Sequence, residues 1–381
     1  MSAYQYYEFR ALDRPLTKRE MGELRALSTR ATITATSFVN TYEWGDFKGD
    51  PDALMARYFD AFVYLANWGT RRLMLRFPRG LVDDNALSSY CHGESARMRK
   101  TSEFIIVSFW QEDESFEWEE DDEEWMDSLI PLREEVLRGD LRCLYLGWLR
   151  GVQNGEFDDD DAEPTVPRGL AKLSAPLEAF VELLSMDRDL IAVASQRSPR
   201  PKAGPTQSHL EVWIGKMPEN EKDALLLEAI SADHPHLRTG LLRRFEQSRR
   251  SRKHNSPQTQ PSRTVGELLA AANARAAEHS RALAERAAAE RARQERERTA
   301  ARAKYLDQLA AREYEVWDQV AHLIQTRQPS NYDRAVSCLV DLRDLASRHG
   351  RGQEFKAAMD RLREIHSQKP SFLLRLQKAR L

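Results

Sequence analysis

The sequence has no apolar run long enough to cross a membrane. One of its longest, Phe104–Trp110, is far shorter than the about 18 residues that a spanning helix needs. The first residues, MSAYQYYEFR, lack the basic and then apolar layout of a secretory signal. The three cysteines, Cys91, Cys143 and Cys338, lie too far apart for a disulfide framework or a Cys-x-x-Cys metal site. These absences predict a cytoplasmic protein without a membrane partner.

The sequence also lacks the short motifs of common enzyme classes. It contains no P-loop, no dinucleotide-binding glycine turn, no nucleophile elbow and no zinc-protease helix. Cys91 and His92 are adjacent, whereas a catalytic nucleophile and its base usually meet across a fold. The acidic run 158–161 lacks the glycine and distal glutamate of a calcium loop, and His234 and His236 have no further ligand at a useful spacing. We therefore predict no catalytic residue, no metal site, no cofactor and a protein that is not an enzyme.

Charge is distributed unevenly along the chain. Residues 1–200 contain 24 Lys and Arg against 37 Asp and Glu, whereas residues 201–381 contain 33 against 23. Six of the eight tryptophans fall within the first 150 residues. An acidic, aromatic-rich front is therefore joined to a basic back, a pattern that bears on partners and association and not on fold.

Residues 1–112 are predicted to form an α+β domain. Alternating and helical apolar periods predict strands, helices and turns in the order β-α-β-β-α-β, which is typical of a ferredoxin-like sandwich. A further strand at Phe104–Trp110 would extend the sheet. The elements are a strand at Tyr4–Leu12, a helix capped by Thr17 and Glu20, two strands within Ala31–Trp44 that turn at Ser37–Asn40, a helix from Asp50 to Gly69, and a strand through Leu73, Leu75 and Phe77.

All-α regions are predicted to follow. Residues 113–248 are expected to be helical with acidic loops, and 249–262 to form a basic flexible linker because they contain no apolar residue. Residues 263–312 are rich in Ala, Arg and Glu and predict one long helix. Its apolar seam is mostly alanine, so an exposed spacer or a weak antiparallel pair is favoured over a homodimeric coiled coil, which stays the alternative. Residues 313–381 predict a small helical bundle with one helix pair of the tetratricopeptide (TPR) kind.

Two segments are candidates for binding a protein partner. Residues 112–124 contain ten acids in thirteen positions, with aromatic residues among and beside them, so this segment is either a solvated loop or a docking segment for a basic surface. The helical faces of the terminal bundle are the second candidate. The predicted partner-binding residues are Trp118, Trp125, Tyr332, Leu339, Phe355 and Leu362.

A basic cluster is the best candidate for nucleic-acid binding. It contains six cations within eleven positions, and only Phe245 is available to stack on a base, so the contact would be blind to sequence. The alternative is that a basic helix end simply suits solubility and the helix dipole. The cluster consists of Arg243, Arg244, Arg249, Arg250, Arg252 and Lys253.

Parts of the sequence resemble known bacterial proteins. Arg263–Ala272 (RTVGELLAAA), the Ala/Arg/Glu helix, Tyr332–Ala346 and Lys369–Ala379 resemble the tail of bacterial SWIM-type zinc-finger proteins. The segments YQYYEFRALDRPLT and NWGTRRLMLRFP resemble an uncharacterised bacterial family that shares this tail. The family's zinc motif needs Cys-x-Cys and Cys-x-His, which this sequence lacks. The resemblance therefore implies a component of a bacterial cytoplasmic assembly and implies no activity.

The sequence as a whole favours a non-enzymatic scaffold or adaptor for a bacterial cytoplasmic assembly. It would dock a protein partner through the C-terminal bundle and the acidic segment. The first alternative is a sequence-independent nucleic-acid factor that uses the cluster Arg243–Lys253. The second is an unrecognised enzyme in the α+β domain, because one fold can carry many unrelated functions.

Overall fold

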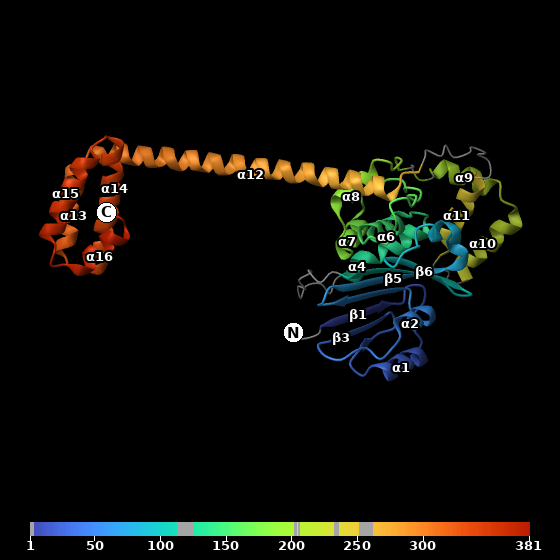
Figure 1. Ribbon diagram of the computed structural model, residues 1–381. Coiled ribbons are helices and arrows are strands. Elements are labelled where there is room, and N and C mark those ends of the chain that lie inside the picture. Colours follow the sequence, from blue (N-terminus) through green and yellow to red (C-terminus); the bar gives the residue numbers. More distant parts are fainter. Residues whose placement is uncertain (1–3, 113–124, 202–203, 205, 232–235, 251–261) are drawn as a thin grey trace. The chain divides into compact units, whose positions relative to one another are not determined.

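The structure is a computed structural model that describes residues 4–112, 125–201, 204, 206–231, 236–250 and 262–381. The chain divides into two compact units, Met1–Glu278 (unit 1) and His279–Leu381 (unit 2). Unit 1 contains an antiparallel sheet and helices, and unit 2 is helical (Figure 1). The α+β fold class with a following helical part is therefore confirmed.

The sheet of unit 1 has seven strands in the order β2-β3-β1-β4-β5-β7-β6. All neighbouring strands are antiparallel, and β1 lies between β3 and β4, where Phe9 is opposite both Phe38 and Phe62. The strands are β1 (Gln5–Arg10), β2 (Thr32–Ile33), β3 (Ser37–Tyr42), β4 (Ala61–Ala66), β5 (Thr70–Pro78), β6 (Ala96–Lys100) and β7 (Phe104–Glu112).

The predicted element order β-α-β-β-α-β is present from β1 to β4. A ferredoxin-like topology is not confirmed, and two predicted elements are wrong. The helix that begins after Asp50 ends at Arg57, and residues 61–66 form the strand β4 in the middle of the sheet. This strand is buried on both faces, so its sequence AFVYLA is a continuous apolar run that periodicity alone cannot distinguish from a helix. Residues 37–40 belong to β3, and the turn comes earlier, where Thr34 and Ser37 pair. The added strand at Phe104 is confirmed as β7.

Each face of the sheet carries its own core. The helices α1 (Lys18–Leu27) and α2 (Pro51–Arg57) cover one face, over a cluster of phenylalanines. The predicted capping box opens α1: Thr17 Oγ1 accepts from the Glu20 amide at 3.2 Å, and Glu20 accepts from the Thr17 amide at 2.8 Å. Figure 1 shows α4, α6 and α7 on the opposite side of the sheet from α1 and α2. The helices associated with this second core are α3 (Asp84–Ser88), α4 (Trp125–Leu129), α5 (Pro131–Leu137), α6 (Arg142–Gln153), α7 (Ala175–Leu183) and α8 (Arg188–Ser195).

Three further helices and the start of a long helix complete unit 1. The three are α9 (Gln207–Gly215), α10 (Glu219–Ser231) and α11 (Leu237–Arg250). The long helix α12 runs without a break over Val265–Ala310, as predicted. Its first turns belong to the core of unit 1, because Val265 and Leu268 are buried among the residues of the second core. The boundary between the units therefore lies within α12 and not at the predicted linker, most of which falls outside the described residues.

Unit 2 contains the second part of α12 and the helices of the segment 313–381, where a bundle was predicted. The end of α12 contributes Leu306 and Leu309 to its core. Tyr332 packs against Phe372 with ring centroids 5.5 Å apart. The remaining helices are α13 (Glu313–Gln325), α14 (Pro329–Arg348), α15 (Gly352–Ile365) and α16 (Pro370–Lys378). A likeness of α14 and α15 to a TPR unit stays a prediction, as does a homodimer through α12, whose residues 277–300 are all exposed.

Candidate interaction surface

The residues predicted to bind a partner are partly used by the fold itself. Tyr332 and Leu339 lie inside unit 2, and Phe355 and Leu362 are half-buried against the same core. Trp125 is half-buried against the second core of unit 1. These side chains therefore stabilise the two units. Trp118 lies outside the described residues.

The basic cluster is also partly engaged within unit 1. Arg243 donates to the carbonyls of Gly80 at 3.0 Å and Val82 at 2.9 Å, which attaches α11 to the loop after β5. Arg244 forms an ion pair with Glu221 of α10 at 2.5 Å. Both guanidinium groups thus have partners within unit 1. The other members of the cluster lie outside what the structure describes, either as side chains or altogether: Arg249, Arg250, Arg252 and Lys253.

The thiol of Cys91, beside His92, is held in its protonated form. Burial raises the pKa of the Cys91 thiol to about 12, so the thiolate that a nucleophile needs is not populated near neutral pH. Within the described parts of the chain, no group of three or more His, Cys, Asp or Glu side chains is placed to hold a metal ion.

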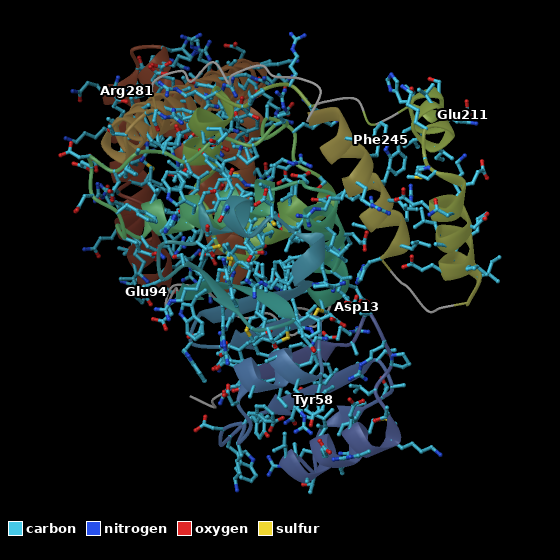
Figure 2. All side chains as sticks on the ribbon, turned by 90° about the vertical axis from the view of Figure 1, so that its right-hand side faces the viewer. Asp13, Tyr58, Glu94, Glu211, Phe245 and Arg281 are labelled. Atoms are coloured by element: carbon cyan, nitrogen blue, oxygen red, sulfur yellow. The ribbon has the colours of Figure 1, made fainter. Side chains whose placement is uncertain are left out.

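One buried cluster of charged groups was not predicted from the sequence. Arg133 of α5 donates from both terminal nitrogens to Asp13, each at 2.7 Å, and its Nε donates to the carbonyl of Arg76 at 2.7 Å. Asp60 accepts from Arg76 at 2.8 Å and from the amide of Leu12 at 2.7 Å. These groups, near Asp13 in Figure 2, satisfy one another and hold β5, α5 and the segment that follows β1 together.

The same cluster touches the segment that leads into α11. His236 Nε2 lies 2.7 Å from Asp13 Oδ1. Burial raises the pKa of Asp13, but the hydrogen bonds and charges of Arg133 and His236 outweigh burial and keep that pKa below its ordinary value. Asp13 is therefore ionised at neutral pH, and it lies against His236 in the segment that leads into α11.

A surface pocket of about 500 Å³ lies among α9, α10 and α11. Trp213 of α9 and Phe245 of α11 form part of its wall, with ring centroids 5.6 Å apart in an edge-to-face arrangement. Figure 2 shows Phe245 on α11 facing α9, which carries Glu211. The volume of this pocket is in the range of pockets that bind small ligands or single side chains.

Large apolar side chains are exposed on α9 and α10. Val212 and Ile214 of α9 are 59% and 48% exposed, and Leu226 and Ile230 of α10 are 61% and 83% exposed. These four residues are called the α9–α10 surface below. Leu226 and Ile230 are four positions apart and so lie on one side of α10, next to each other. A helix that is apolar on more than one side normally lies in a core or against a partner.

The sequence contained a signal for this surface. The run DALLLEAI of α10 (residues 223–230) has no consistently polar side, which is unusual for a helix at the edge of a domain. The pocket could not be predicted, because Trp213 and Phe245 are 32 positions apart in the sequence and meet only through the packing of α9 on α11.

The chain has no match among family models, among curated proteins or among solved structures. None of the described helices combines the length and the apolar character needed to cross a membrane.

Proposed function

We propose that the protein is a non-enzymatic adaptor that docks a protein partner through the α9–α10 surface. The exposure of Val212, Leu226 and Ile230 on consecutive helices is the observation that carries this proposal. Single exposed apolar residues are ordinary on soluble proteins, but several large ones on two consecutive helices favour an interaction site. The same three helices bury little of their own: Phe245 is the one large apolar side chain of α9 to α11 that is buried among the residues described.

Unit 2 supplies a second candidate surface for the same role. Tyr314, Ile365 and Leu374 are 88%, 73% and 53% exposed. Docking through the bundle therefore rests on these outward side chains and not on Tyr332 or Leu339, which lie in the core.

The chemistry of the described residues supports an adaptor over the alternatives. An enzyme needs a charged or nucleophilic group that is available to a substrate, whereas Asp13, Asp60 and Arg133 are used by one another. Nucleic-acid binding through the basic cluster would have to compete with the contacts that Arg243 and Arg244 make inside unit 1.

Replacing Leu226 and Ile230 together by serine is expected to abolish capture of the partner and to change the free energy of unfolding by no more than about 0.5 kcal/mol. Both side chains are exposed, so the fold does not depend on them. The measurement is affinity capture with the tagged full-length protein from a nuclease-treated bacterial lysate, with captured proteins quantified by mass spectrometry and stability followed in urea.

A matched control replaces Leu27 and Leu283 by serine, which removes exposed apolar surface from helices outside both candidate docking surfaces (38% and 53% exposed). This control should capture the same proteins as the wild type. Equal capture by the wild type and by the variant of Leu226 and Ile230 would contradict docking through the α9–α10 surface.

A further inference from the structure

The pocket among α9, α10 and α11 has walls suited to one large apolar side chain. Val212, Met217 and Pro218 line it together with the rings of Trp213 and Phe245. Aromatic walls of this kind bind an inserted aromatic or aliphatic side chain well, because apolar area is buried without ordering new loops.

The charged residues that line the pocket are two cations, Lys216 and Arg244, and one acid among the described residues, Glu221. Glu221 is already paired with Arg244 at 2.5 Å. No carboxylate among the described residues lies within ion-pair distance of Lys216, so this ammonium group is open to an incoming anion.

The nearby acids on the same helices do not cancel this charge. Glu211 accepts a hydrogen bond from Gln207 at 2.9 Å, and Glu219 pairs with Lys222 at 3.2 Å. Neither lines the pocket. The mouth of the pocket is therefore apolar with one available positive charge at its edge.

We propose that this pocket binds a segment of a partner protein in which an aromatic or large aliphatic side chain stands between carboxylates. The apolar side chain lies against Trp213 and Phe245, and a neighbouring carboxylate pairs with Lys216. This inference rests on the proposed adaptor function and names the chemistry of the docked segment.

A single-stranded nucleic acid fits the pocket less well. Binding of such a strand depends on several cations along a groove that follow the phosphates. Here Arg244 is paired with Glu221, so Lys216 is the one cation of the lining without a carboxylate partner in the part that the structure describes. One carboxylate beside an apolar anchor matches this arrangement better.

The test is fluorescence anisotropy of the full-length protein with a labelled synthetic peptide that carries one phenylalanine flanked by aspartates and glutamates. Two comparison peptides replace the phenylalanine by serine or the acids by their amides, and each is expected to bind about tenfold more weakly. Trp213→Ala is expected to weaken binding about tenfold and Lys216→Glu about fivefold. Because Lys216 is exposed, Lys216→Glu remains informative even if Trp213→Ala fails to fold.

Lys356→Glu is the matched control, since it makes the same change of charge at an exposed position of α15 and should leave the affinity unchanged. The inference is overturned by an absence of saturable binding up to about 1 mM peptide, by equal effects of Lys216→Glu and Lys356→Glu, or by displacement of the peptide by a single-stranded oligonucleotide that binds more tightly.

The failure of this inference can be told apart from failure of the adaptor proposal. If the peptide does not bind while serine at positions 226 and 230 still abolishes partner capture, the pocket inference falls and the adaptor proposal stands. If peptide binding depends on Lys216 while that double variant captures its partners normally, the pocket inference stands and docking through the α9–α10 surface falls.

Discussion

Ending the chain at Ser262 is expected to unfold unit 1, whereas ending it at Leu283 is expected to leave unit 1 as stable as in the full chain. The shorter chain loses Arg263, which pairs with the buried Glu163 at 2.7 Å. Tyr145 donates to the same carboxylate at 2.5 Å. Removing one member of a buried ion pair costs about 3–5 kcal/mol, because the remaining charge is left without its partner.

The shorter chain also loses apolar core. Val265 and Leu268 are 1% and 0% exposed within unit 1, and burying each such side chain contributes about 1.5–3 kcal/mol. The combined loss is comparable with the whole stability of a typical domain, about 5–15 kcal/mol. Urea unfolding followed by tryptophan fluorescence would measure this loss, since Trp317 is the one tryptophan of the sequence beyond Glu278.

Two point variants of the full chain measure the contribution of the buried ion pair without removing α12. Arg263→Met should destabilise unit 1 by about 3–5 kcal/mol. Arg275→Met should cost less than about 1 kcal/mol, because Arg275 pairs with Asp189 at 3.0 Å with half of its side chain exposed. If Arg263→Met costs no more than Arg275→Met, the buried ion pair does not stabilise unit 1 as proposed. A stable fragment ending at Ser262 would show that α12 does not belong to the fold of unit 1.

The start of α12 shows which structural features could be predicted from the sequence and which could not. The helix itself was predictable, because Ala, Arg and Glu favour helix and the Thr264–Glu267 capping box marks its start. What could not be predicted is that its first turns pack into unit 1, since Glu163 and Arg263 are 100 positions apart. Residue preferences and capping residues predict where a helix begins and ends. Which unit the start of α12 packs against depends on long-range contacts such as the buried pair of Glu163 and Arg263.

The sheet shows the opposite case, in which local signals were misleading. Residues 61–66 are apolar throughout because β4 is covered on both faces, and an apolar run that follows a capped helix predicts a longer helix. The missing information was the partner strands β1 and β5, which exist only in the folded sheet. The pocket among α9, α10 and α11 could not be predicted for the same reason, because its walls come from three helices that meet only in the folded protein.

Arg133→Met is expected to lower the free energy of unfolding of unit 1 by about 3–5 kcal/mol at neutral pH. Arg133 is 3% exposed, pairs with Asp13 at 2.7 Å and lies 3.6 Å from Asp60, so its loss removes a cation from two carboxylates at once. Arg138→Met, at the residue that caps the C-terminal end of α5, is the matched control: the ion pair of Arg138 with Glu134 is exposed, so this variant should cost less than about 1 kcal/mol. Equal stability of these two variants in urea would contradict a structural role for the buried cluster.

The effect of Arg133→Met should also depend on pH in a defined direction. The folded pKa of Asp13 is lowered, because Arg133 and His236 outweigh the effect of burial. The stability that ionised Asp13 contributes is therefore present above its unfolded pKa of about 3.9 and is lost as pH falls through the folded pKa. Without Arg133 that contribution is small at any pH, so the difference in unfolding free energy between wild type and variant should be largest near pH 7 and should narrow below about pH 4. Urea unfolding of both proteins at several pH values measures this, and a difference that stays constant from neutral to acid pH would place the stabilising contact of Arg133 on groups other than Asp13.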